Sequence, residues 1–404
     1  MQLSNIVALA LLVAGGWPLA CLGQTNAPVK IGVISDMSGP YADNVGPGQA
    51  LAVRMAVADF GGKVLGRPIE VLVADDQNNS NVGVGIIRRW LDVENISALV
   101  EGSISSITLA AAGLVNEKDR VLLISGSGSE DLTGKSCTPT SFQFTYDTYS
   151  LPKAVVTRSM TDGLKTWFVI GVDYAYGRSL LETTRRFVEQ GGGKVVGSAM
   201  FPLNSGDFSS YLLAAQASGA NAVAFATGGS DWINVVKQSR EFELAKTGQV
   251  MVSLATGSPD VTAAGLQAAG GMLLATPFYW DANDESRAWS KRFMAANAGR
   301  PPTFQQAGSY SATLHYLKGV QSAGTLEGSK VAAAMRAMPV DDFEIKQAPI
   351  RADGQVMRPM YLARVKTPAT SKGVTDIYEI IGEIPADQVW RPAAEGGCKH
   401  ASTP

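Results

Sequence analysis

The sequence predicts an α/β fold with two parallel sheets, each covered by helices on both faces. Three observations support this prediction. Short apolar runs that suit buried strands alternate with helical stretches from Val29 onward, which is the pattern of βαβ units. The alternation restarts after Tyr149, so that each half carries its own units. The chain has 404 residues, 46% hydrophobic and 17% charged, which is enough to build two lobes.

The first half is expected to contain strands separated by helices. The strands are VKIGVIS (29–35), PIEVLVAD (68–75), SALVEG (97–102) and RVLLISG (120–126). The helices are expected at Gly48–Phe60, at Ser80–Glu94 and at 106–117. The glycines that follow Phe60 end the first helix.

The second half repeats this pattern. Its strands are TWFVIGV (166–172), GKVVGSAMF (193–201), NAVAFATG (221–228), QVMVSLAT (249–256) and GGMLLATPF (270–278). Residues 284–337 are expected to be mainly helical and 342–384 to form strands with turns. A polar tail rich in proline and glycine follows Pro385.

The fold class indicates where a ligand would bind. In open parallel sheets, ligands bind beyond the carboxyl ends of the strands, where loops and helix N-termini converge. The candidate loops are 35–47, 102–106, 125–131, 173–178, 227–232, 255–260 and 276–282.

The first 24 residues indicate export. Residues 1–24 hold no charged side chain, and their apolar core is too short to span a bilayer, which is typical of a secretory signal peptide. The absence of a basic residue near Met1 departs from the usual pattern. Cleavage after Gly23 would give a soluble exported protein. The alternative is a lipid anchor at Cys21, against which Pro18 counts because a lipoprotein signal usually has leucine there.

The cysteine count agrees with an oxidising compartment. Once Cys21 is removed or lipidated, Cys137 and Cys398 remain. The natural interpretation is a disulfide that ties the C-terminal tail to the loop after SGSGSEDLTG. The alternative is two unpaired thiols.

Several kinds of chemistry are disfavoured. Of the two histidines, His315 lies at helical spacing among apolar residues and His400 lies in the tail, which argues against a catalytic triad, a zinc site or a Cys-His pair. Asp75 and Asp76 could bind a cation, although shaping a turn before the next helix explains them better. The net charge of −2, with scattered Lys and Arg, makes nucleic acid and anionic membranes poor partners.

The stretch LISGSGSEDLTGKSC (123–137) approaches a phosphate-binding loop but fails on spacing. The P-loop needs a glycine five positions before Gly134, where this chain has Ser129, and two acidic residues would repel a polyphosphate. Its glycines and Ser127 suit a single carboxylate better, because backbone N–H groups and hydroxyls can bind it together. The segment EGSISS places Ser106 at a helix start in a similar way. The alternative is that these serines only cap helices.

The chain resembles the periplasmic solute-binding proteins of ABC transporters, in the branched-chain amino acid class. The resemblance covers about 28–392 and rests on VKIGVISDMSGPYAD, ADFGGKVLGRPIEVLVADDQN, VLLISGSGSEDLTG, VIGVDYAYG and GGMLLATPFYWD. It implies the type I fold, in which two Rossmann-like lobes joined by three crossovers close on a ligand. The implied division is lobe I (28–145 plus 277–348), lobe II (146–276 plus 349–392) and a C-terminal tail (393–404).

The resemblance also implies ligand-binding positions. In members that bind amino acids, a serine at a helix start and a small-residue loop of lobe I hold the ligand's carboxylate. Those positions fall here on Ser106, Ser127 and Ser129. The tyrosine of the YG motif, here Tyr176, would face the cleft from lobe II.

Two departures from the family pattern bear on the ligand. Such members pair the ligand's ammonium with a lobe II acid in the loop that here reads LATGSPD, where 254–256 carry no acid and Asp260 lies too far along. Where they have a tyrosine, this chain has Gly228 and Gly229, which indicates a gain of space. Both departures favour a larger carboxylate over an α-amino acid. An aromatic acid is one option, since some relatives resemble importers of aromatic acids.

Aromatic side chains could line such a cleft. The candidates are Tyr41, Tyr146, Tyr149, Tyr176 and Tyr279. For each of them the alternative is packing against the surface of a lobe. Asp231, next to Trp232, could point inward and meet a hydroxyl or a cation.

The sequence therefore predicts a monomeric periplasmic receptor, without cofactor or metal, that delivers a small organic carboxylate to an ABC permease. A branched-chain or other amino acid remains the alternative ligand. A sensor that reports ligand occupancy to a regulatory partner is a second alternative. A secreted α/β enzyme is a third, against which the shortage of histidine counts.

Overall fold

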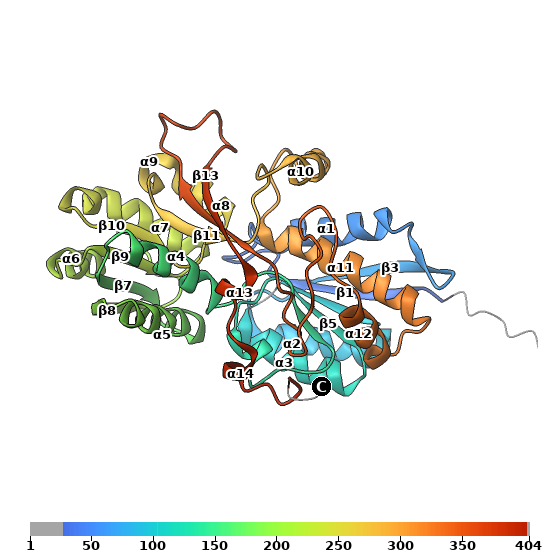
Figure 1. The fold of residues 1–404 in the computed structure, drawn as a ribbon. Coiled ribbons are helices and arrows are strands. Elements are labelled where there is room, and N and C mark those ends of the chain that lie inside the picture. Colours follow the sequence, from blue (N-terminus) through green and yellow to red (C-terminus); the bar gives the residue numbers. More distant parts are fainter. Residues whose placement is uncertain (1–26, 103, 402–404) are drawn as a thin grey trace, which may run out of the picture.

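The computed structural model describes residues 27–102 and 104–401 of the chain. The strands form two sheets that lie side by side, and helices cover both faces of each (Figure 1). This arrangement of two α/β lobes confirms the predicted fold class. The expected signal peptide, including Cys21, lies outside the described residues.

The lobe I sheet is built around β1 (Val29–Ser35). Its spatial order is β2 (Lys63–Val64), β3 (Arg67–Asp75), β1, β4 (Ala98–Gly102), β5 (Val121–Ile124) and β6 (Ser141–Gln143). β2 runs antiparallel to β3, and the other neighbours pair in parallel. The sequence did not indicate β2 and β6, because two or three residues are too short a run to show a strand pattern.

Helices from both halves of the chain cover this sheet. One face carries α1 (Gly46–Asp59), α11 (Phe304–Ala323) and α12 (Gly328–Ala337), and the other carries α2 (Ser80–Arg89) and α3 (Ser105–Glu117). α10 (Asp284–Ala296) lies beside α1, where Arg292 donates to Asp59 at 2.6 Å. A π-turn, η1 (Trp90–Glu94), extends α2.

In the lobe II sheet, β11 (Leu273–Thr276) is the third strand from one edge. Its spatial order is β13 (Tyr378–Ile384), β12 (Met360–Val365), β11, β10 (Val250–Ser253), β9 (Ala222–Ala226), β7 (Thr166–Val172) and β8 (Lys194–Phe201). β12 is antiparallel to both of its neighbours. One face carries α4 (Ser150–Thr161) and α5 (Ala175–Gln190), and the other carries α6 (Ser209–Ala217), α7 (Gly229–Glu241), α8 (Ser258–Ala264) and α9 (Leu266–Ala269).

The C-terminal region differs from the expectation in two places. Residues 342–359 form isolated bridges instead of strands, because this segment crosses between the lobes and bonds to Gln143 through the backbone of Gly354 and Val356. The tail contains two short helices, α13 (Ala386–Val389) and α14 (Ala393–Gly396), each preceded by a proline.

The tail is attached to lobe I. The predicted disulfide between Cys137 and Cys398 is present, with a Cα–Cα distance of 5.6 Å. Arg391 adds a bond of 3.0 Å to Glu130 at the start of the short helix η2 (Glu130–Thr133). In the described part of the chain, no helix is long and apolar enough to cross a membrane.

Arg358 joins the three segments that cross between the lobes. Its guanidinium donates to the carbonyl of Phe144 on the first crossing at 3.4 Å, to that of Pro277 on the second at 2.6 Å, and to the carboxylate of Glu344 on the third. The side chains of Arg358 and Glu344 are almost fully buried. A buried ion pair is costly to break, because each partner would be left as an uncompensated charge.

Burial raises the pKa of the Glu344 carboxyl from 4.5 to about 7, and the opposing effect of Arg358 reduces that shift without cancelling it. The second carboxylate oxygen, Oε2, is buried without a hydrogen-bond partner. Because the folded pKa lies above the unfolded one, the folded protein holds the extra proton between pH 4.5 and 7. The free energy of unfolding therefore falls as the pH rises through that window.

Replacing Glu344 by glutamine tests whether this carboxyl causes the fall in the free energy of unfolding. The free energy of unfolding of the wild type, minus that of Glu344→Gln, should fall by on the order of 3 kcal/mol from below pH 4.5 to above pH 7. Denaturant titrations across this range measure it. Glu241→Gln, on the exposed end of α7, should show no such dependence. A difference that grows with pH would mean instead that Arg358 holds the pKa of Glu344 below its usual value.

Candidate functional site

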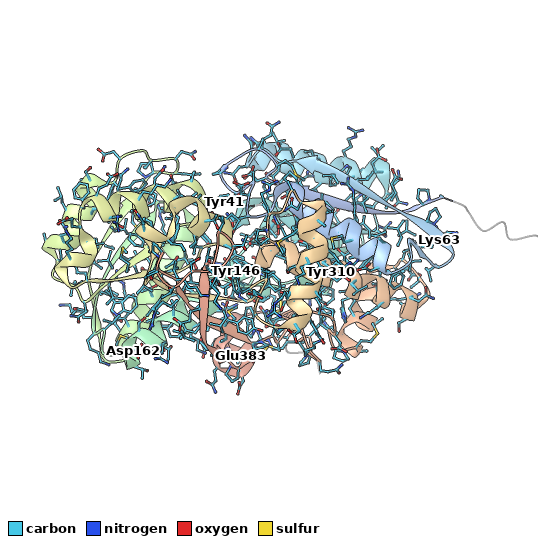
Figure 2. The ribbon with its side chains drawn as sticks, turned by 90° about the horizontal axis from the view of Figure 1, so that it is seen from above. Tyr41, Lys63, Tyr146, Asp162, Tyr310 and Glu383 are labelled. Atoms are coloured by element: carbon cyan, nitrogen blue, oxygen red, sulfur yellow. A yellow bond between two sulfur atoms is a disulfide. The ribbon has the colours of Figure 1, made fainter. Side chains whose placement is uncertain are left out.

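A cavity lies between the two lobes, where the carboxyl ends of strands from both sheets face each other. Its volume is about 60 Å³. The loops after β1, β4 and β5 form the lobe I wall, and those after β7, β9 and β10 form the lobe II wall. Figure 2 shows Tyr41 and Tyr146 in the middle of the molecule, with Lys63 and Asp162 towards opposite ends. This cavity therefore lies at the edge of the sheets where the fold class predicts a ligand to bind.

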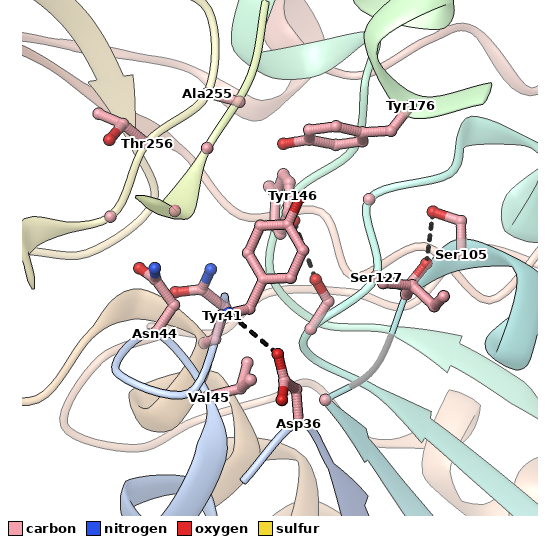
Figure 3. Close-up of a pocket in the computed structure, with 18 of the residues that line it drawn as sticks. Asp36, Tyr41, Asn44, Val45, Ser105, Ser127, Tyr146, Tyr176, Ala255 and Thr256 are labelled. Carbon is pink, nitrogen blue, oxygen red and sulfur yellow. Dashed lines mark hydrogen bonds between the residues drawn. The ribbon is translucent and has the colours of Figure 1, made fainter. Parts of the chain in front are cut away.

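The lobe I wall can bind an anion. α3 begins at Ser105 after Ile104, which supplies no side-chain cap, and among the described residues no side chain accepts a bond from the first N–H groups of this helix, which can therefore face a ligand. Ser127 Oγ donates to Ser105 Oγ at 3.2 Å (Figure 3). Because Ser105 accepts this bond, its own hydroxyl proton is available to a ligand. Gly126 and Gly128 complete the wall with bare backbone.

Four tyrosines from both lobes converge on the cavity, three of which Figure 3 labels. The hydroxyls of Tyr41 and Tyr174 lie 3.0 Å apart across the lobe boundary. Tyr146 donates to the carbonyl of Gly126 at 2.9 Å and shares a side-chain hydrogen bond with Tyr176. Burial raises the pKa of all four phenols, so they stay neutral and can act as hydrogen-bond donors.

Asp260 is a buried carboxylate that connects the lobes. Its Oδ1 accepts a bond of 2.8 Å from Asn44 of lobe I. Its Oδ2 accepts from the Thr256 hydroxyl and from the backbone N–H groups of Gly229 and Gly257, at 3.0 to 3.2 Å. Burial raises the pKa of Asp260, and these hydrogen bonds act in the opposite direction.

The expected gain of space at Gly228 and Gly229 is not found. The ring of Tyr41 enters from lobe I and occupies that position. A Cβ on Gly229 would lie 2.6 Å from the carbonyl oxygen of Pro40 and 3.1 Å from the Tyr41 ring. Gly229 thus lets the lobes approach each other, and it does not enlarge the cavity.

The structure brings together four of the nine predicted ligand-binding residues. Tyr41, Ser127, Tyr146 and Tyr176 line the cavity. Among the serines, Ser106 bonds to the Ser80 hydroxyl at 2.7 Å on the exposed side of α3, and Ser129 precedes η2. Both lie outside the cavity lining.

The other three predicted residues pack within lobe II, including Tyr279, which belongs to the core cluster of that lobe although the implied division placed it in lobe I. Tyr149 packs edge-to-face on Phe187. Tyr279 donates to the carbonyl of Thr375 at 3.0 Å. Asp231 accepts a bond of 2.9 Å from the backbone of Asn204, and burial raises its pKa. None of the three lines the cavity in the described part of the chain.

Other lining residues were missed. Ser105 is one position before the predicted Ser106, and Tyr174 is two before Tyr176. Asp260 was placed too far along the chain, yet it lies in the cavity lining. It is the third residue of α8, and its side chain reaches back to the backbone N–H of Gly257. That capping pattern, G-x-x-D before a helix, was the signal that could have found it.

Three carboxylates could in principle hold a metal ion. Oxygen atoms of Asp36, Asp75 and Asp76 lie within 4.8 Å of one another. Asp36 and Asp75 accept backbone N–H bonds from 37–41, so they already shape the loop that carries Tyr41. This agrees with the turn-forming role expected for Asp75 and Asp76.

The sequence matches the family model of periplasmic binding proteins over residues 28–373. The Leu/Ile/Val-binding protein homolog 7 of Brucella suis is 27% identical over 246 residues. That match spans 58% of this chain and 59% of the relative, less than two thirds of its length.

Two solved structures are more similar. A periplasmic binding protein from Burkholderia mallei is 40% identical, with a TM-score of 0.89, and the match covers 92% of this chain and 99% of that one. A branched chain amino acid ABC transporter periplasmic ligand-binding protein from Burkholderia xenovorans is 38% identical, with a TM-score of 0.85 and coverage of 93% and 100%.

Gly229→Ala should hold the lobes apart, because the new Cβ would collide with Pro40. Gly219→Ala is a matched control: its φ of 62° is close to the 63° of Gly229, but no atom lies near its Cβ position. Both variants should lose about 1 kcal/mol of stability from the left-handed backbone. Small-angle X-ray scattering should give a larger radius of gyration for Gly229→Ala alone. Equal radii would show that this contact does not limit closure.

Proposed function

The chain belongs to the periplasmic binding protein family, and on this premise we propose that it captures a small organic carboxylate and delivers it to the permease of an ABC importer. The observation that carries the proposal is the lobe I wall. The start of α3, where Ile104 supplies no side-chain cap, lies together with Ser105 and Ser127 on a cavity whose opposite wall comes from lobe II.

This wall suits a carboxylate on chemical grounds. The first N–H groups of a helix carry partial positive charge and point at a bound anion. The Ser105 hydroxyl, which accepts from Ser127, adds a directed donor, and the bare backbone at Gly126 and Gly128 permits close approach. No lysine or arginine lines the described cavity, so the wall is adapted to a single negative charge and not to a polyphosphate.

An amino acid ligand would also need an acceptor for its ammonium group. Asp260 is the lobe II acid that lines the cavity, and both of its oxygens already accept bonds from Asn44, Thr256 and two backbone N–H groups. An unpaired ammonium in a buried site is costly. The geometry therefore favours a carboxylate without an amine.

The mechanism is capture without chemical change. The carboxylate binds first to the serines and helix start of lobe I, and the tyrosines of lobe II then close over it. Closure presents a joined surface of both lobes, which a permease can distinguish from the open form. The proposal includes export to the periplasm through the signal peptide at 1–24 and action as a monomer.

Ser127→Ala tests the carboxylate wall. A thermal-shift panel of acetate, propionate, lactate, benzoate and leucine should identify at least one carboxylate that raises the Tm. For the strongest of these, Ser127→Ala should weaken Kd by about tenfold or more, because it removes the hydroxyl that, by donating to Ser105, leaves the Ser105 proton for the charged carboxylate. Ser129→Ala is the control, because Ser129 lies two residues away and outside the lining. Equal losses in both variants, or no response to any carboxylate, would contradict the proposal.

A further inference from the structure

The cavity between the lobes is small, which limits the size of the ligand that it can hold. Its volume of about 60 Å³ is well below the roughly 150 Å³ of a cavity that accepts a benzene ring. The limit comes from Tyr41, whose ring lies against Gly229 and whose hydroxyl meets that of Tyr174. A ligand that fits between the lobes in this arrangement is therefore short and carries no ring.

One polar side chain on the cavity wall lacks a partner. Gln305 is the second residue of α11, lines the cavity and is 7% exposed. Its amide oxygen, Oε1, is buried without a hydrogen bond among the described residues, whereas Nε2 is not one of the buried unpaired atoms. Its neighbour Gln306 differs, because the Gln306 amide is used by the capping box of α11. A buried amide left unpaired costs free energy, so Gln305 is suited to bind a ligand.

The chemistry of the Gln305 amide limits the kind of ligand group that it would bind. An amide both donates and accepts, which matches a hydroxyl. An ammonium would need a free anion nearby. Asp260 and Asp36 both line the cavity, and Asp260 already accepts four hydrogen bonds while Asp36 accepts two from backbone N–H groups. A purely apolar chain would leave the Gln305 amide unsatisfied.

We propose that the ligand is a short hydroxy acid whose carboxylate binds at Ser105 and Ser127 and whose hydroxyl binds the Gln305 amide. Tyr41 sets the upper limit on its size. This inference rests on the proposed function, since it assumes that the cavity captures a carboxylate.

Calorimetric titration of the purified protein with matched probes tests the ligand class. Lactate, alanine and propionate share one carbon skeleton and differ in a hydroxyl, an ammonium or a hydrogen. 3-Hydroxypropionate moves the hydroxyl, and benzoate adds a ring. Lactate or 3-hydroxypropionate should bind about 10- to 100-fold more tightly than propionate, because propionate leaves Gln305 unpaired. Alanine and benzoate should bind more weakly than either hydroxy acid.

Variants test the two named residues. Gln305→Leu should bring the hydroxy acid to within about threefold of propionate while propionate itself changes little, a ratio that a purely structural role would not move. Gln305→Met is a second variant in case the first folds poorly, and Gln190→Leu on the exposed end of α5 is the control. Tyr41→Ala should admit benzoate, whereas Tyr41→Phe, which keeps the ring, should not.

The outcomes separate this inference from the proposed function. Tighter binding of benzoate or alanine than of both hydroxy acids by the wild type would overturn the ligand class and leave carboxylate capture standing. A preference for the hydroxy acid that survives in Gln305→Leu and Gln305→Met would overturn the role of Gln305. Failure of every carboxylate to bind would overturn the proposed function together with this inference.

Discussion

The arrangement of the two lobes depends on Arg358. Each crossing segment is short and irregular, and each carries backbone groups that need partners. One buried guanidinium reaches the carbonyls of Phe144 and Pro277 and the carboxylate of Glu344, so that a single planar group satisfies all three crossings. The disulfide and Arg391 hold the tail to lobe I beside this region. The site lies between lobes whose connections are fixed in this way.

The contact between the lobes follows from small residues facing large ones. The segment from Pro40 to Asn44 projects from lobe I, and lobe II receives it with Gly229 and Gly257. Asp260 connects the two sides of this contact, because its carboxylate accepts hydrogen bonds from the backbone of both glycines and from Asn44. The charge of Asp260 is thus used to join the lobes, which explains how an acid can line the cavity without serving as a partner for a ligand's ammonium.

The sequence predicted the long elements better than the site. Apolar runs such as 29–35 and 166–172 are strands because both faces of a parallel sheet are buried. A continuous apolar run can be recognised from neighbouring residues alone. The loops were predicted in the right region. Ser105 contacts Ser127 at the cavity, however, whereas Ser106 contacts Ser80 on another side of α3, so an error of one residue at the helix start selected the wrong side chain. Gln305 lines the cavity from a segment some 180 residues after Ser127, and no local sequence pattern indicates that two such distant residues lie in one cavity.

The size of the cavity cannot be predicted from the side chains of one wall alone. Gly228 and Gly229 remove bulk from lobe II, which taken alone predicts room for a larger ligand. The ring of Tyr41 occupies the space beside these glycines, and its hydroxyl contacts that of Tyr174 in lobe II. In a receptor of two lobes the enclosed volume is therefore a property of how the walls fit each other. Specificity then depends on residues such as Tyr41, which act by filling space, as much as on the groups that bind the ligand.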